Sequence, residues 1–288
     1  PSLSTVILFG PSGWMMANWR PGGCSLVSMT MQRTGSRILS SLLTELKASS
    51  RGKPFSLGCM ATSKPDSRRK AVRRMAARLD RRFGGEAWDR TRKRPDPLDD
   101  LVRTILSQNT TDENRDRAFD DLRLALPTWE AVRTARSNRI KQLIRPAGLV
   151  NAKGPAIQAF LKWLKRERDE LDLSYLKDMT ADEGIEELVQ HKGVGLKTAY
   201  IVLAFACDHD LCAVDTHVHR ILKRTEIIDG QCTREKAHDE IRSLIPKGKA
   251  RPFHANLIDL GKQICTARSP DCPNCPLLPD CPYAGKML

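Results

Sequence analysis

Residues 185–205 read IEELVQHKGVGLKTAYIVLAF, in which two apolar helical segments flank a glycine-rich turn. One helix is expected to end near Gln190 and the next to begin near Leu196, with Gly-Val-Gly at 193–195 between them. Two glycines placed two positions apart permit positive φ and a close backbone approach. The free N–H groups at the start of the second helix can then bind an anion. This pattern predicts a helix–hairpin–helix, a motif that holds a DNA phosphate without reading bases.

Apolar residues continue at helical spacing on both sides of this hairpin, from about residue 75 toward the C-terminus. Residues 98–106 are one example, and strand-like alternation is almost absent there. A capping box is expected at Thr180 and Glu183. The links between the helical segments are short and contain Pro or Gly. The sequence therefore predicts an all-α protein of about ten helices.

Lys197 lies in the first turn of the second hairpin helix. The ordinary interpretation of such a lysine is a solvated side chain. A cation is disfavoured at a helix N-terminus, however, and this field together with partial desolvation would lower the pKa of the amine. An unprotonated amine can attack the anomeric carbon of a nucleotide and form a Schiff base. Lys197 is therefore the predicted nucleophile.

Asp215 lies in the segment AVDTH at 213–217, directly before another predicted helix. It could be a plain N-cap. It could also be a carboxylate that faces Lys197, because breaking an N-glycosidic bond builds positive charge on the sugar and a nearby carboxylate stabilises that charge. The residues themselves leave both interpretations open.

Four cysteines crowd the C-terminus in the pattern C-x6-C-x2-C-x5-C: Cys265, Cys272, Cys275 and Cys281. Four thiolates at this spacing suit either Zn²⁺ or a 4Fe–4S cluster, and the residues do not choose between the two. The other five cysteines are scattered, unlike the disulfide framework of a small secreted domain. We therefore expect a reduced intracellular protein with one C-terminal metal site.

Together these motifs resemble the endonuclease III family of helix–hairpin–helix DNA glycosylases, over roughly residues 75–285. The resemblance rests on GVGLKTA at 193–199, on AVDTH with its spacing from the lysine, and on the cysteine tail. It implies a 4Fe–4S cluster rather than zinc, Lys197 as the Schiff-base nucleophile and Asp215 as the catalytic carboxylate. It also implies a fold of two helical lobes with a DNA cleft between them.

Two further loops match family motifs. LSQNTTD at 106–112 matches a region from which family members insert a Gln into the DNA stack. The aligned residue here is Asn109, with Gln108 just before it. AGLVNAK at 147–153 matches a second wedge loop, in which Asn151 is the candidate inserting residue. Helix capping and loop hydrogen bonding are the alternative role for both loops.

Two charged residues extend the predicted DNA interface. Lys192 stands where the family usually has Pro before the hairpin, and it could add a phosphate contact. Arg268, in the loop between the first two clustered cysteines, is either a contact to the DNA backbone or a solvated charge. The predicted DNA-binding residues are therefore Gly193, Val194, Gly195, Lys192, Gln108, Asn109, Asn151 and Arg268.

The resemblance also divides the chain into parts. Residues 98–209 would form a helical barrel lobe that contains the hairpin. Residues 75–97 and 210–288 would form the second lobe, which ends in the cluster loop. Residues 1–74 lack sustained periodicity, so we expect a disordered or non-native N-terminal extension, with a transit peptide as the alternative.

The formal net charge of +14 and the pI of about 9.6 favour a polyanionic partner. Residues 1–74 hold much of this charge, with twelve Lys or Arg against two acidic residues. No stretch approaches the roughly 20 apolar residues of a membrane span. We expect an intracellular monomer without a membrane partner, located in the cytoplasm or nucleoid if the source is bacterial.

The predicted function is that of a bifunctional DNA glycosylase and AP lyase of base excision repair. Its expected partner is double-stranded DNA that contains damaged bases or abasic sites, and its expected substrates are oxidised pyrimidines. The reaction would pass through the Schiff base and end in β-elimination. The alternatives are a glycosylase for mismatched or alkylated bases, a non-catalytic iron–sulfur DNA-binding protein, and a zinc-bound DNA adaptor.

Overall fold

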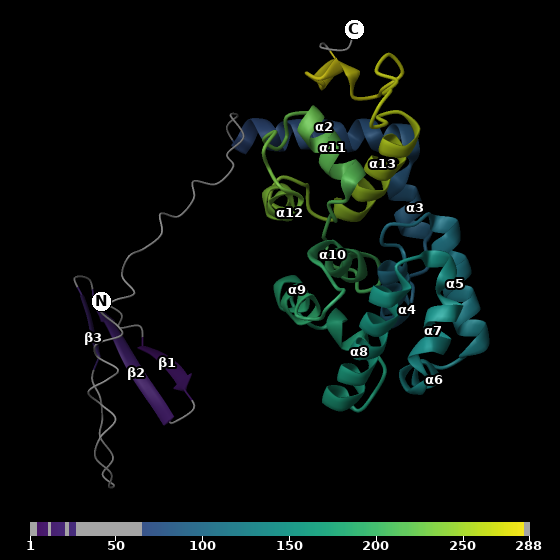
Figure 1. The fold of residues 1–288 in the computed structure, drawn as a ribbon. Coiled ribbons are helices and arrows are strands. Elements are labelled where there is room, and N and C mark those ends of the chain that lie inside the picture. The colour runs from purple at the N-terminus through teal and green to yellow at the C-terminus, as the bar shows by residue number, and fades with distance from the viewer. Residues whose placement is uncertain (1–4, 11–12, 21–22, 27–64, 285–288) are drawn as a thin grey trace. The chain divides into compact units, whose positions relative to one another are not determined.

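The computed structural model describes residues 5–10, 13–20, 23–26 and 65–284. The chain divides into two compact units, Pro1–Ser56 and Leu57–Leu288, which are described separately (Figure 1). In the described residues no helix is long and apolar enough to cross a membrane.

The first unit contains three antiparallel strands in the order β1-β2-β3: β1 Thr5–Gly10, β2 Gly13–Arg20 and β3 Gly23–Leu26. Thr5 pairs with Asn18 at one end of the first ladder, and Gly10 pairs with Gly13 at the other. These strands differ from the disorder expected for residues 1–74. The segments are rich in β-branched, aromatic and other apolar residues between glycines, a composition that favours strands even without clear alternation.

The second unit is helical throughout residues 65–284, so the all-α prediction is confirmed there. Its α-helices are α2 Pro65–Phe83, α3 Gly85–Thr91, α4 Pro97–Leu106, α5 Asp112–Ala125, α6 Trp129–Thr134, α7 Ser137–Leu143, α8 Val150–Arg168, α9 Ala181–Val189, α10 Leu196–Phe205, α11 Thr216–Arg224, α12 Arg234–Arg242 and α13 Ala250–Gln263. Three short 3₁₀ helices accompany them: η1 Arg145–Ala147, η2 Ser174–Lys177 and η3 Leu278–Asp280.

Helix α2 begins ten residues before the expected start of the folded region. The helix is rich in arginine but also has an apolar stripe of Val72, Met75 and Leu79, which are all buried. Their spacing places them on one face of the helix, while the charged residues occupy the other faces. The stripe anchors α2 in the same core as α11, α12 and α13.

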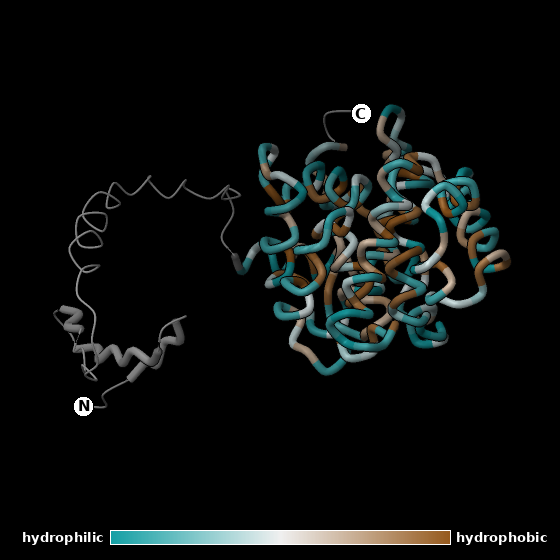
Figure 2. Tube along the Cα trace, turned by 60° about the horizontal axis from the view of Figure 1, so that its bottom comes forward, coloured by the Kyte–Doolittle hydropathy of each residue, from teal (hydrophilic) through white to brown (hydrophobic). Residues whose placement is uncertain are grey.

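Two separate hydrophobic cores define two helical lobes (Figure 1). The first core contains apolar residues from Leu98 on α4 to Ala213, and includes α10. The second contains the apolar face of α2 and residues from Cys212 to Leu277. Figure 2 shows hydrophobic segments gathered inside the helical unit and hydrophilic segments on its outer faces. The chain therefore passes from the first lobe to the second between Leu211 and Val214.

Local signals account for several helix ends. The Thr180 side chain accepts a hydrogen bond from Glu183 N while the Glu183 side chain accepts from Thr180 N, which confirms the predicted capping box of α9. Thr111 caps α5 by accepting from Asn114 N. The ends of α4 and α5 thereby fix the loop between them, which borders the cleft described below.

Lys153 is a fully buried lysine on α8. Its Nζ donates to the carbonyl oxygens of Leu106, at the end of α4, and of Ala147 in η1, both at 2.7 Å. Burial lowers the pKa of this amine. One side chain thus satisfies two helix-end carbonyls and ties together the two loops that were matched to wedge loops in the sequence.

Replacing Lys153 with Met should lower the free energy of unfolding by about 2–3 kcal/mol, because buried carbonyls then lose their donor. The measurement is urea unfolding of the purified variant. Lys162→Met is the matched control, since Lys162 is exposed on the same helix and should change stability by less than about 0.5 kcal/mol. Equal losses in both variants would contradict the structural role.

Candidate active site and cluster loop

The hairpin joins α9 to α10 as the sequence predicted. Gly193 has φ of 91°, and a Cβ there would lie 2.6 Å from the Cβ of Ala156 on α8. Val194 is 4% exposed and packs in the first core, so its side chain anchors the turn. Gly195 differs from the expectation, because its φ of −89° needs no glycine. It is the N-cap of α10 and its missing side chain leaves open space there, so the helix N-terminus stays accessible.

Lys197 is the second residue of α10 and lines a cleft of about 970 Å³. Burial lowers the pKa of its amine. The carboxylates of Asp215 and Asp100 act in the opposite direction, and Arg115 adds to the lowering. Desolvation therefore favours the uncharged, nucleophilic form of this lysine, as the sequence predicted.

Asp215 lines the same cleft and is also the N-cap of α11. Its Oδ1 accepts a hydrogen bond of 2.8 Å from Val218 N. The N-cap interpretation is therefore confirmed, and the cap bond fixes the Asp215 carboxylate beside the cleft that Lys197 also lines. Lys197 belongs to a helix of the first lobe and Asp215 begins a helix of the second.

Two histidines that sequence reasoning missed hold the segment before Asp215. His254 on α13 hydrogen-bonds through Nδ1 to Ala213 O at 2.8 Å, so that nitrogen carries the proton. His238 on α12 accepts from Val214 N through Nε2 at 2.9 Å. The peptide group between Ala213 and Val214, where the chain passes from the first lobe to the second, is thus held at both its carbonyl and its N–H by side chains of the second lobe. The only signal in the sequence was a histidine on the apolar face of each helix.

The His238 contact needs a neutral ring because its Nε2 accepts, whereas His254 can donate from Nδ1 in either protonation state. Burial lowers the pKa of His254 to about 4 and also lowers the pKa of His238. The unfolded pKa is about 6.5. Since the folded pKa is depressed, stability is complete above about 6.5 and falls as the pH drops toward the folded value.

The free energy of unfolding should therefore fall by about 2 kcal/mol between pH 7 and pH 5 through His254 alone. Urea unfolding across this range measures it. His254→Asn keeps a donor for Ala213 O but does not titrate, so its pH dependence should be shallower by that amount. Parallel curves for the two proteins would contradict the assignment.

The predicted wedge residues differ in their placement. Gln108 is tied to the hairpin, because its Nε2 donates to Gly193 O at 3.0 Å. Asn109 is exposed, has φ of 52° and lines the cleft. Asn151 is exposed near the start of α8 but is not among the residues that line the cleft. Leu149, which sequence reasoning did not single out, is 54% exposed with φ of 48°. An apolar residue directly after a loop glycine was the signal for it.

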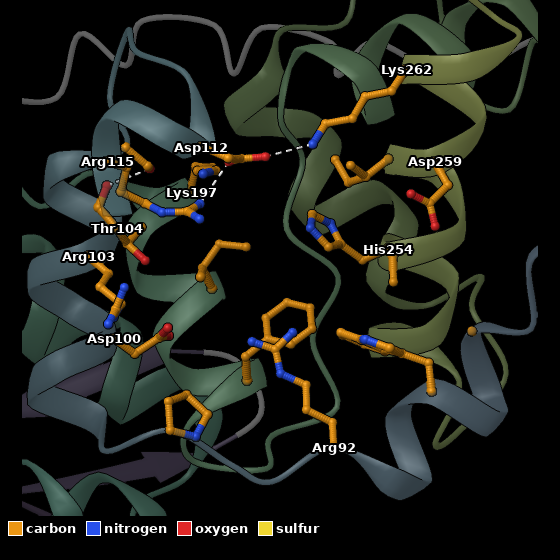
Figure 3. A pocket seen from close by; sticks show the side chains of 18 of the residues that line it. Arg92, Asp100, Arg103, Thr104, Asp112, Arg115, Lys197, His254, Asp259 and Lys262 are labelled. Atoms are coloured by element: carbon orange, nitrogen blue, oxygen red, sulfur yellow. Dashed lines mark hydrogen bonds and ion pairs between the residues drawn. The ribbon is translucent and has the colours of Figure 1, made fainter. Parts of the chain in front are cut away.

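The remaining predicted contacts lie at the surface. Lys192 is exposed beside the hairpin turn. Arg268 is exposed on the cluster loop, outside the lining of the cleft. The cleft itself carries three basic side chains besides Lys197, of which Figure 3 shows the first and the last: Arg115, Arg234 and Lys262.

The four C-terminal cysteines line one small hollow. Ile264, Leu278 and Ala284 make part of its wall apolar. Arg224 closes one side, with Nη1 3.2 Å from the Sγ of Cys265 and 2.7 Å from Thr266 O. The motif therefore folds into a single site, separate from the residues that line the cleft.

The pKa of the clustered thiols bears on which group this hollow can hold. Burial, with a smaller contribution from the other three thiols, raises the pKa of Cys275 to about 11. The Cys275 thiol is therefore stabilised as a thiolate beside a strong positive charge, such as a metal centre. In the described part of the chain, no three His, Cys, Asp or Glu side chains converge tightly enough for a single ion.

Comparisons with known proteins agree with this architecture. Residues 102–247 match the HhH-GPD family, described as HhH-GPD superfamily base excision DNA repair proteins. Endonuclease III of Haemophilus influenzae is 30% identical over 191 residues, which cover 66% of this chain and 86% of that protein. A candidate DNA glycosylase of Arabidopsis thaliana is 38% identical over 169 residues, covering 59% of this chain and 57% of the relative.

Among solved structures, a trapped covalent intermediate of endonuclease III with DNA aligns with a TM-score of 0.66 and 26% identity, over 76% of this chain and 98% of the other. The fold, the hairpin and the basic cleft thus define a DNA-repair enzyme of the glycosylase class. The chain belongs to the HhH-GPD superfamily and is an endonuclease III-like DNA glycosylase and AP lyase.

Proposed function

We propose that the chain removes oxidised pyrimidines from duplex DNA through a Schiff base on Lys197, followed by β-elimination. The observation that carries the proposal is the pairing of Lys197 and Asp215 along one cleft, beside a hairpin suited to phosphate. The lowered pKa of the lysine supports its role as the nucleophile. The solved structure of a trapped endonuclease III–DNA covalent intermediate supports the same type of chemistry.

The reaction would begin with attack of the uncharged Lys197 amine on C1′ of the damaged nucleotide. The bond from C1′ to the base breaks, and the base leaves with the electron pair of that bond. Asp215 would stabilise the positive charge that develops on the sugar. Transfer of one amine proton to the ring oxygen O4′ then breaks the C1′–O4′ bond, which opens the sugar ring and gives the protonated Schiff base. Removal of a C2′ proton then expels the 3′ phosphate, which cuts the strand.

DNA would be held by two kinds of contact. The open N-terminus of α10 and the exposed Lys192 would bind a backbone phosphate. Asn109 and Leu149 would enter the base stack from two loops that Lys153 ties together. Apolar wedges such as Leu unstack DNA, and a damaged pair resists extrusion less than a normal one. We place Asn109 rather than Gln108 in the stack, because Gln108 is bonded to the hairpin.

The cysteine hollow would hold a 4Fe–4S cluster through Cys265, Cys272, Cys275 and Cys281. Zinc–thiolate bonds of about 2.3 Å require sulfur atoms about 3.8 Å apart, whereas a cluster accepts more widely spaced thiolates. Four thiols around one shared hollow supply the ligand set of such a cluster. When bound, it would supply the positive charge that stabilises the four thiolates and would tie the C-terminal loop to α11 and α13.

The purified protein should contain iron and sulfide and absorb broadly in the visible range, because a zinc site would be colourless. Cys272→Ser should lose most of the iron. Cys207→Ser is the control, since Cys207 packs in the first core and should leave the iron content unchanged. Zinc in the wild-type protein without iron would refute the cluster.

A lesion panel tests the activity itself. Duplexes with thymine glycol should be cut by the wild-type protein, and abasic duplexes should form a covalent adduct when borohydride is present. Preferential release of mismatched or alkylated bases would replace the proposed substrate class. Binding to abasic DNA without cleavage would favour a non-catalytic iron–sulfur protein instead.

A further inference from the structure

Asp100 is a buried carboxyl group on α4 that the proposed chemistry does not use. Its side chain is 9% exposed, and its Oδ2 has no hydrogen-bond partner. Its backbone N–H bonds normally to Asp96 O, so the helix itself is regular at this point. A buried polar atom without a partner is rare in folded proteins and destabilises them by about 1–3 kcal/mol.

The exposed part of Asp100 faces a pocket of about 620 Å³ that also includes Lys197 and His254. This volume is typical of small-molecule sites, which span about 300–1,000 Å³. Figure 3 shows Asp100 pointing from α4 into the pocket, with Arg92 on the opposite side. The pocket is thus continuous with the nucleophile, and a base leaving the sugar at Lys197 has this space beside it.

The nearby cations are engaged elsewhere. Arg103 pairs with Asp116 at 3.0 Å and lies over the Phe119 ring, and Arg92 lies over the Trp88 ring. They stabilise the Asp100 carboxylate through space but do not donate to its Oδ2. Asp100 therefore has an unused capacity to accept a hydrogen bond.

The charge state of Asp100 depends on burial, which favours the protonated acid, and on nearby cations, which favour the carboxylate. Burial raises its pKa to about 6, and the surrounding cations Arg92, Arg103, Lys197 and Arg115 oppose the rise. At neutral pH the carboxylate form dominates, and this form only accepts hydrogen bonds. A ligand in the pocket that donates an N–H group to the Asp100 carboxylate would be favoured, whereas a ligand that offers a carbonyl oxygen would be repelled.

We propose that Asp100 reads the exocyclic amino group of the extruded base and makes the enzyme select cytosine-derived lesions over the corresponding uracil-derived ones. The proposal rests on the proposed function, because it takes the base to occupy the pocket beside Lys197. Carboxylates accept from the cytosine N4 amino group in DNA recognition, and a good contact discriminates bases by about 1–3 kcal/mol. In uracil an oxygen replaces this amino group.

The test compares 5-hydroxycytosine with 5-hydroxyuracil in the same duplex, two oxidised bases that differ only on the edge read by Asp100. Release of each free base is measured directly under single-turnover conditions. The wild-type protein should release the cytosine lesion roughly tenfold faster. Asp100→Asn should reverse this preference, because the amide can donate to the uracil oxygen. Asp100→Leu should abolish it, and this variant also removes the unsatisfied buried oxygen and so favours folding.

Asp120→Asn is the matched control, since Asp120 is an exposed acid on α5 and should leave the ratio of the two rates unchanged. A wild-type preference for 5-hydroxyuracil, or an equal ratio in wild type and Asp100→Asn, would overturn the role of Asp100. Borohydride trapping on abasic DNA contains no base and tests the proposed function alone. If trapping succeeds and the two lesions are released at equal rates, only the role of Asp100 is contradicted. If trapping fails, the Schiff-base mechanism is contradicted.

Discussion

Lys197→Ala should form no borohydride-trapped adduct with abasic DNA and should lose roughly 10³- to 10⁶-fold in strand cleavage. The reason is that the Schiff base needs a primary amine at this position. No other lysine occupies the first turn of α10. The measurement is denaturing gel electrophoresis of the reduced adduct together with single-turnover nicking rates.

Two further variants test whether the primary amine of Lys197 is required. Lys197→Arg retains a long basic side chain in the cleft but cannot form a Schiff base, so it should bind abasic DNA and form no adduct. Lys162→Ala makes the same substitution as the test variant on the exposed face of α8, and should form the adduct at the wild-type yield. Adduct formation by Lys197→Ala at that yield would show that another amine is the nucleophile.

Asp215→Asn should reduce base excision by about 10²- to 10⁴-fold while lesion binding and stability stay near wild type. Asn is as good an N-cap as Asp, so the bond to Val218 N is retained. Only the negative charge beside the sugar is lost. Single-turnover excision, equilibrium DNA binding and urea unfolding measure the three properties on one sample.

Asp215→Ala completes the comparison, because it removes both the cap and the charge. It should lose a further ~1 kcal/mol of stability relative to Asp215→Asn, without a comparable further loss of excision. Full excision activity in Asp215→Asn would reduce this residue to a helix cap. Loss of DNA binding in the same variant would indicate that the carboxylate organises the cleft rather than the reaction.

Sequence reasoning succeeded where the determinants are local. The turn at Gly193, the buried Val194, the capping box at Thr180 and the cysteine spacing all depend on residues within a few positions of one another. Backbone geometry and helix-end hydrogen bonding act over that same range. The order of the residues alone is therefore enough to predict these features.

The features that sequence reasoning missed depend on distant packing. His254 contacts Ala213 across 41 positions, and Lys153 reaches Leu106 across 47. Asp100 resembles any helix aspartate until the fold buries it beside Lys197. Propensity and spacing carry no information on such contacts, since they arise only when separate helices meet.

His238 and His254 fix the segment at Ala213 and Val214 to the second lobe, and this attachment links DNA binding to the position of Asp215. Because Asp215 is held to the second lobe and Lys197 belongs to the first, the separation of the acid and the amine depends on how the two lobes pack together. A DNA duplex bound across both lobes would influence how the lobes pack together. The shape of the DNA would then affect the reaction rate before the damaged base enters the pocket. Substitutions at the seam between the lobes would then alter turnover without touching a single reacting atom.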